Sequence, residues 1–155
     1  MDNRIARHAL LAALLVGLGS LVAYAQQVEM KPADLKWVPI PAIPGAQRAL
    51  MLGDSTKPGP YVHRVRFPPK FKHPAHSHSD NRNYTVISGI EYVGIGDKFD
   101  AAKLKAHAAG TFSTYVANTN HFSATKDKGC IIQISGMGPS ELEYVDPKDD
   151  PRKKQ

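Results

Sequence analysis

Cysteine is almost absent from this chain of 155 residues. Cys130 is the only one, so no disulfide can form within the chain. It begins an apolar run, Cys130–Ile134, that is typical of an inner β-strand. We therefore expect a buried core thiol rather than a catalytic nucleophile.

A concentrated basic element is also lacking. Lysine and arginine outnumber the acidic residues by 20 to 14, for a formal net charge of +6, but the excess is spread thinly. The densest basic cluster is Arg152–Lys154, near the C-terminal end. Proteins that bind nucleic acids usually gather lysine and arginine on one element, with aromatic residues between them. We therefore expect no nucleic-acid partner, and only mild attraction to small anions.

A hydrophobic run long enough to span a membrane is missing as well. The apolar segment Ala9–Ala25 is shorter than the roughly 20 residues that a spanning helix needs. Two arginines precede it, and it ends in the small-x-small cleavage pattern Ala23-Tyr24-Ala25. Residues 1–25 are thus predicted to be a signal peptide, followed by a mature chain that begins at Gln26. This predicts a periplasmic or secreted protein that does not associate with the membrane after cleavage.

Helical sequence is scarce, because twelve prolines and twelve glycines divide the chain into short pieces. Only Asp100–Ala108 is typical of a helical turn, with Asp100 as its cap. Short alternating runs between turn signals predict many strands, and hence an all-β sandwich or barrel. These runs are Gln47–Leu52, Tyr61–Phe67, Tyr84–Ser88, Ile90–Ile95, Thr111–Val116, Cys130–Ser135 and Glu141–Val145.

The mature chain has the length of one domain with one core. Residues 26–38 are predicted to be an N-terminal arm, 39–146 the folded domain, and 147–155 a flexible polar tail. The prolines in Trp37–Gly45 exclude a helix there and restrict this segment to an edge strand or an arm.

Three histidines are the strongest functional signal. His76 and His78 are one residue apart, so in an extended strand both side chains lie on the same face. Two imidazoles at this spacing can hold one metal ion or one anionic ligand. His121 lies in a second strand-like segment and completes a candidate metal site.

The other histidines have weaker patterns. His63 alternates with Tyr61 and Val65, which places it on the interior face as a core or pocket residue. His73 is three residues before His76, so in a regular strand it points away unless the chain bends at Pro74. His107, in the predicted helical turn, is expected to be solvated.

The segment around His76 resembles the first motif of the cupin superfamily. That motif is Gly, five residues, His-x-His, three or four residues, Glu, six residues, Gly. His76, His78 and Gly89 match it, whereas Lys70 and Arg82 replace the first Gly and the Glu. The second motif is Gly, five residues, Pro-x-Gly, two residues, His, three residues, Asn. Gly110 and His121 match this motif, whereas Val116, Asn118 and Thr125 replace its Pro, Gly and Asn.

This resemblance, which extends to small exported bacterial single-domain cupins, covers roughly residues 39–152. It implies a small jelly-roll β-barrel and a divalent metal cofactor bound by the three histidines. Iron, manganese, zinc, nickel and copper all remain candidates. The implied partner is a small-molecule ligand or substrate, and the implied chemistry, if the protein is an enzyme, is of the metal-dependent dioxygenase or isomerase type.

Arg82 conflicts with this expectation, because a cation replaces a carboxylate on the inward-facing side of the strand. Three arrangements are open. Arg82 could swing outward, could meet the metal through a bridging ligand anion, or could belong to a metal-free anion pocket. Asp80 or Asn83 could substitute as a metal ligand.

We therefore expect an exported single-domain cupin that binds a divalent metal through His76, His78 and His121. The alternatives are a metal-free module that binds a small anion through Arg82 and the pocket histidines, and an inert structural domain. The candidate pocket residues are Arg82, Tyr84, His63 and Gln133. A homodimer is left open.

Overall fold

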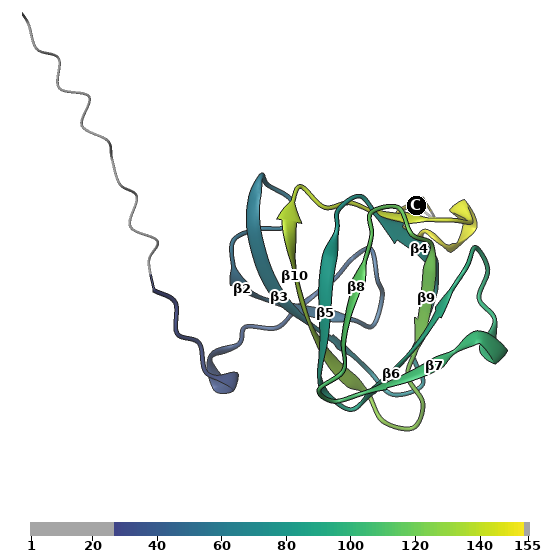
Figure 1. The fold of residues 1–155 in the computed structure, drawn as a ribbon, viewed down its shortest axis with the longest axis horizontal. Coiled ribbons are helices and arrows are strands. Elements are labelled where there is room, and N and C mark those ends of the chain that lie inside the picture. Colours follow the sequence, from purple (N-terminus) through teal and green to yellow (C-terminus); the bar gives the residue numbers. More distant parts are fainter. Residues whose placement is uncertain (1–26, 154–155) are drawn as a thin grey trace, which may run out of the picture.

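The computed structural model describes residues 27–153, so the predicted signal peptide over 1–25 lies outside the described residues. Two antiparallel sheets make up almost all of the regular structure (Figure 1). This confirms the predicted all-β jelly roll. The six-stranded sheet has the order β1 (Val38–Pro39), β2 (Gln47–Leu52), β3 (Gly59–Phe67), β10 (Cys130–Gly138), β5 (Arg82–Ser88) and β8 (Phe112–Tyr115).

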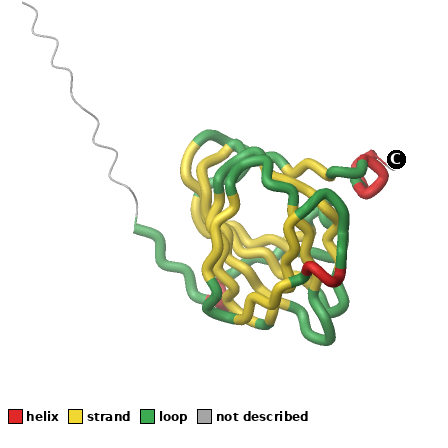
Figure 2. The backbone as a smooth tube through the Cα atoms, turned by 45° about the vertical axis from the view of Figure 1, so that its right-hand side comes forward, coloured by secondary structure: helices red, strands yellow, loops and turns green. Residues whose placement is uncertain are grey.

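The second sheet has five strands, in the order β11 (Leu142–Tyr144), β4 (Lys72–His78), β9 (His121–Ala124), β6 (Ile90–Ile95) and β7 (Lys105–Ala108). The two sheets surround a common interior, which is clearest in the tube view (Figure 2). Side chains on alternate residues of each strand point into it. The short β1 is an edge strand that pairs only with β2, as the prolines of its segment predict.

The core lies on the inner face of the six-stranded sheet. Alternate residues of β3, β5 and β10 are buried together, with Tyr61 and Ile132 the most enclosed. Cys130 belongs to this cluster and is only 2% exposed, as its apolar run predicts. The core therefore fills one part of the interior, and the polar residues described below line another.

Helical structure in the described chain consists of 3-10 turns. These are η1 (Pro32–Asp34), η2 (Ala101–Lys103), η3 (Pro147–Asp149) and η4 (Pro151–Lys153). The helical turn predicted over 100–108 is correct only for η2, where the Asp100 carboxylate accepts the Ala102 N–H. The rest of it, Lys105–Ala108, is β7, because β6 offers a free edge with which this segment pairs. In residues 27–153 no helix has the length and apolar character to cross a membrane.

The backbone is left-handed at the two positions where this sequence replaces the glycines expected from the motifs. Lys70 and Asn118 have φ angles of 56° and 62°, in the left-handed region that favours glycine. At Gly89, which matches the motif, φ is 76° and a Cβ atom would lie 2.3 Å from the Gly129 carbonyl oxygen. The turns that flank the histidine strands thus form despite the two substitutions.

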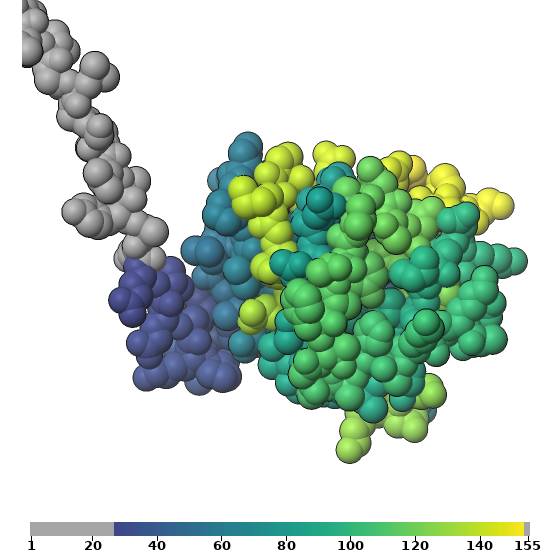
Figure 3. All heavy atoms as spheres, in the orientation of Figure 1, coloured from purple at the N-terminus to yellow at the C-terminus, as the bar shows by residue number. Residues whose placement is uncertain are grey.

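The polar segment after residue 146 packs beside β11. Asp150 is 4% exposed, and its carboxylate accepts the Arg152 Nε–H at 2.7 Å. Arg152 also donates to the Leu142 carbonyl of β11 at 3.0 Å. In the space-filling view this C-terminal segment, in yellow, lies along the upper edge of the molecule (Figure 3). The segment therefore borders the opening of the interior cavity, which Asp150 and Arg152 help to line.

Candidate metal centre

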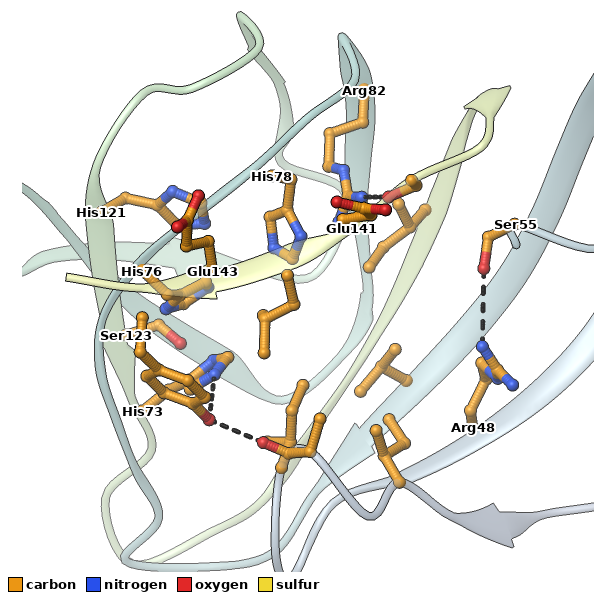
Figure 4. A pocket seen from close by; sticks show the side chains of 18 of the residues that line it. Arg48, Ser55, His73, His76, His78, Arg82, His121, Ser123, Glu141 and Glu143 are labelled. Carbon is orange, nitrogen blue, oxygen red and sulfur yellow. Dashed lines mark hydrogen bonds between the residues drawn. The ribbon is translucent and has the colours of Figure 1, made fainter. Parts of the chain in front are cut away.

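The structure brings His76, His78 and His121 together. Each offers one ring nitrogen, and these nitrogens all lie within 4.8 Å of one another. His76 and His78 come from β4, whereas His121 comes from the neighbouring β9, where it is paired directly opposite His76. Two adjacent strands of one sheet therefore hold all three imidazoles, and Figure 4 shows them on the same side of the cavity.

Backbone carbonyls fix the orientation of two of these rings. His76 Nδ1 lies 2.7 Å from the Pro74 carbonyl oxygen, and His121 Nδ1 lies 2.9 Å from the Thr119 carbonyl oxygen. A neutral imidazole that donates from Nδ1 keeps the lone pair of Nε2 free. Hydrogen bonds of this kind commonly orient metal-binding histidines. Both rings are thus prepared to offer Nε2 to an ion.

All three histidine rings are held in the neutral form. Burial lowers the pKa of His76, and the neighbouring imidazoles lower it further. Burial also lowers the pKa of His78, followed by the charge of Arg82 and then the neighbouring imidazoles. Burial likewise lowers the pKa of His121, against the opposing effect of its bond to the Thr119 carbonyl. Unprotonated nitrogens are what a metal ion requires of its ligands. The donor set would suit a transition metal better than magnesium or calcium, which prefer oxygen.

His73 also faces the interior, contrary to the regular-strand expectation. The pairing of β4 with β9 contains a bulge between His73 and His76, so one extra residue of β4 is accommodated there. The bulge falls at Pro74, which has no N–H to donate to a neighbouring strand. His73 therefore stacks on His76 with ring centroids 3.6 Å apart, and its Nε2 lies 3.3 Å from the Tyr144 hydroxyl. His73 therefore packs against His76 but is not one of the three grouped donors.

Arg82 faces inward, as strand parity predicts, but its charge is neutralised. Its Nη2 lies 2.6 Å from Asp80 Oδ1, and both side chains are almost fully buried. The Tyr61 hydroxyl donates to the other carboxylate oxygen of Asp80 at 2.5 Å. None of the three arrangements expected for Arg82 describes this ion pair. Asp80 serves as the counter-ion of Arg82 and is not part of the histidine group, which corrects its expected role as a substitute ligand.

The remaining contacts of Arg82 leave little of it for a ligand. Nη1 donates to the Tyr84 hydroxyl at 3.3 Å, Nη2 donates to the Ser140 hydroxyl, and Nε donates to Asp80 at 3.2 Å. Each guanidinium nitrogen therefore has a partner within the protein. A free anion would have to displace these contacts to bind there.

The three histidines open onto one cavity of about 710 Å³. This volume is in the usual range for sites that bind small molecules. The predicted pocket residues Arg82, Tyr84 and His63 all line it. Gln133 does not, because the inward positions of β10 are taken by its neighbours Ile132 and Ile134. Instead Gln133 accepts a hydrogen bond from Arg64 at 3.1 Å, which corrects its predicted pocket role.

Glu91 lines the cavity too, and sequence reasoning did not single it out. It lies on β6, is 6% exposed, and burial raises its pKa to about 7, against a hydrogen bond from Ser123 that lowers it. The carboxyl group is thus poised to gain or lose a proton near neutral pH. Its alternation with Val93 was the available signal, but alternation alone does not say which face of β6 points inward.

Two further carboxylates, Glu141 and Glu143, line the cavity from the region of β11, and both are exposed (Figure 4). They lie outside the group of three histidines. The centre is therefore a three-imidazole set with no carboxylate among its grouped donors in the described chain.

Solved structures of other proteins share the fold of this chain. The polyketide cyclase RemF from Streptomyces resistomycificus aligns with a TM-score of 0.67 and 14% identity, over 81% of this chain and 90% of that one. A cupin-superfamily sugar phosphate isomerase from Silicibacter pomeroyi aligns at 0.55 and 15%, over 75% and 80%. An RmlC-like cupin from Ralstonia eutropha aligns at 0.58 and 20%, over 77% and 73%.

No family model matches this sequence, and no curated protein matches it either. Likeness at these identities concerns the fold. The chain has the cupin jelly-roll fold, as its two histidine motifs predict.

Proposed function

We propose that this protein binds a divalent metal ion through His76, His78 and His121 and holds a small molecule beside it in the cavity. The observation that carries the proposal is the set of three nitrogen donors within 4.8 Å of one another, on paired strands. Three neutral ligands would leave coordination positions open for water or a substrate. A metal held in this way supplies Lewis-acid chemistry to whatever occupies those positions.

The ion pair between Asp80 and Arg82 weakens the main objection to a metal, although the charge of Arg82 still helps to lower the pKa of His78 and of His121. An isolated guanidinium beside the histidines would repel a dication strongly. Here the Asp80 carboxylate lies 2.6 Å from the guanidinium, so the pair has no net charge. The same pairing makes the metal-free alternative less favoured, because Arg82 is already engaged. An inert structural domain would not need a cavity lined by neutral metal-binding groups.

The reaction is proposed only by class. The neighbours named above include a cyclase and an isomerase, so one fold serves different chemistries. We propose metal-dependent dioxygenase or isomerase chemistry on a small-molecule substrate. The residue of this chain suited to hold or release a proton is Glu91, at its carboxyl oxygens, because its pKa is about 7.

Export to the periplasm or medium is part of the proposal and is supported by the signal-peptide pattern at 1–25. An intact mass that begins at Gln26, measured on protein from the native host, would agree with it. A full-length mass in the cytoplasm would refute it.

Metal content tests the central proposal. Purified protein, stripped with chelator and reloaded with zinc or copper, should retain about one equivalent per chain after dialysis. His78→Ala should lose at least tenfold in metal affinity, because one of three ligands is removed. His107→Ala is the matched control, since His107 on β7 is not among the grouped donors, and its replacement should leave affinity unchanged.

The proposal fails if the wild type retains no metal from any of the five candidate ions. It also fails if His78→Ala and His107→Ala retain metal equally, because the bound ion would then lie elsewhere.

A further inference from the structure

The far end of the cavity contains an arginine whose contacts are incomplete. Arg48, on β2, has a buried Nε with no hydrogen-bond partner, and its Nη1 reaches only the Ser55 hydroxyl, at 3.5 Å. Among residues 27–153, no carboxylate lies within ion-pair distance of it. Both Arg48 and Ser55 line the cavity, and Figure 4 shows them across it from the histidines. A positive charge thus borders the cavity without a direct ion-pair partner, although it acts through space on the Asp54 carboxylate and helps to lower the pKa of that group.

His63 lies beside this arginine and is also unpartnered. It is 6% exposed, its Nδ1 is buried without a hydrogen bond, and it lines the same cavity. Burial, together with the charges of Arg48 and Arg82, lowers its pKa to about 3. The ring is therefore neutral at physiological pH and can donate one hydrogen bond and accept another.

The register of β2 and β3 places the two side chains on one face. Arg48 is paired with Val65, and Leu50 is paired with His63. Residues directly opposite in an antiparallel pair share a face of the sheet, so Arg48, Val65 and His63 lie on the same side. That side is the cavity wall, because His63 and Val65 are both buried there.

Unsatisfied buried polar groups are uncommon in native proteins and call for an explanation. An arginine that donates its N–H groups to anionic oxygens makes strong, directional hydrogen bonds. We propose that Arg48, Ser55 and His63 form a second subsite of the cavity, which binds the carboxylate or phosphate group of a small organic anion.

The wall between the two ends defines the rest of the ligand. Apolar side chains line it, among them Val65, Ile132 and Ile134. The ligand would then have an anionic group at Arg48, an apolar middle, and an oxygen near His76, His78 and His121. This two-ended description rests on the proposed metal function, whereas the anion subsite alone does not.

Calorimetric titration of metal-free protein tests the subsite separately from the metal. The probes are 3-phenylpropanoate and its neutral counterpart 3-phenylpropanamide, which differ only in the charged group. Wild type should bind the carboxylate about tenfold to a hundredfold more tightly than the amide, the range for a hydrogen-bonded charge. Arg48→Gln should lose this preference.

Arg64→Gln is the matched control, because Arg64 is on the adjacent strand and its Nε donates to Gln133 outside the cavity. It should keep the preference. If Arg48→Gln does not fold, Arg48→Lys, which keeps the charge but loses the planar fork, should show an intermediate loss. Inorganic phosphate that competes with the carboxylate points to phosphorylated ligands, and failure to compete points to carboxylates.

The proposal is overturned if wild type binds both probes equally or binds neither at millimolar concentration. It is also overturned if Arg48→Gln keeps the full preference. Because no metal is present in these titrations, failure of the metal site would leave the result unaffected. Repeating them with zinc-loaded protein should tighten binding only for ligands that reach both ends.

Discussion

Each end of the cavity has an arginine, but only one of the two arginines has an ion-pair partner. At the histidine end, Arg82 is buried and paired with Asp80 at 2.6 Å, and its remaining nitrogens donate to Tyr84 and Ser140. At the other end, Arg48 has a buried nitrogen with no partner and only a long contact to Ser55. The first arginine is part of the protein's own structure. The second is available to a ligand, which shows that residue type alone does not separate a structural charge from a binding one.

Two buried carboxyl groups make the same point about pKa values. Burial alone would raise the pKa of Asp80, but hydrogen bonds from Tyr61 and Arg82 and the charge of Arg82 outweigh it and lower the pKa. Burial raises the pKa of Glu91 to about 7, where only a hydrogen bond from Ser123 opposes it. The hydrogen bonds from Tyr61 and Arg82, together with the charge of Arg82, therefore keep Asp80 ionised, whereas Glu91 has only one opposing hydrogen bond.

The largest expected effect on stability comes from breaking the ion pair between Asp80 and Arg82. Asp80→Asn keeps the shape of the side chain but leaves the buried Arg82 without its counter-ion. Removing one partner of a buried ion pair costs about 3–5 kcal/mol. We expect a loss of this size in the free energy of unfolding, measured by urea denaturation at neutral pH.

Asp127→Asn is the control for that experiment, because Asp127 is exposed and should change stability by less than about 0.5 kcal/mol. If the two variants lose equally little free energy of unfolding, buried Arg82 does not depend on Asp80 for its stability. The contrast between the two arginines is then wrong.

A smaller effect is expected from the carboxyl group that lacks a cation. The pKa of Glu91 rises from 4.5 to about 7 on folding, so the folded state binds its proton more tightly. The associated stability is complete at acidic pH below 4.5 and is lost as the pH rises to about 7. The shift corresponds to roughly 3 kcal/mol. As the pH rises from 4.5 to about 7, the free energy of unfolding of Glu91→Gln should therefore increase by about this much relative to that of wild type.

Urea denaturation of both proteins at several pH values measures this difference. Glu143→Gln, at an exposed position that also lines the cavity, should follow the wild-type curve. Parallel curves for wild type and Glu91→Gln would show that the Glu91 carboxyl titrates normally.

The smallest effect on stability is expected at the unpaired end. Arg48→Gln removes a charge that has no carboxylate partner in the described chain. We expect a change within about 0.5 kcal/mol in the free energy of unfolding, in the absence of any ligand. A loss close to that of Asp80→Asn would mean that Arg48 is structural, and it would remove the contrast from which the second subsite is inferred.

Much of the fold and part of the site follow from the sequence alone. Alternation of apolar residues between turn signals predicts most of the strands, since side chains in a strand alternate between two faces. The single residue between His76 and His78 places both on one face for the same reason. The position of His121 after Gly110 follows from the motif spacing. The first two are local properties that a single strand is enough to specify, whereas the place of His121 is what the resemblance to the cupin motif implies.

Only the tertiary structure decides which side chains meet across strands. The bulge at Pro74 depends on how β4 pairs with β9, and it turns His73 inward. Asp80 neutralises Arg82 because its carboxylate, in the turn before β5, accepts hydrogen bonds from both the Arg82 guanidinium and the Tyr61 hydroxyl of β3. Gln133 and Glu91 each lie on an alternating strand, yet one faces outward and the other inward. A sequence shows that two faces exist, but which face is buried depends on where the other sheet packs.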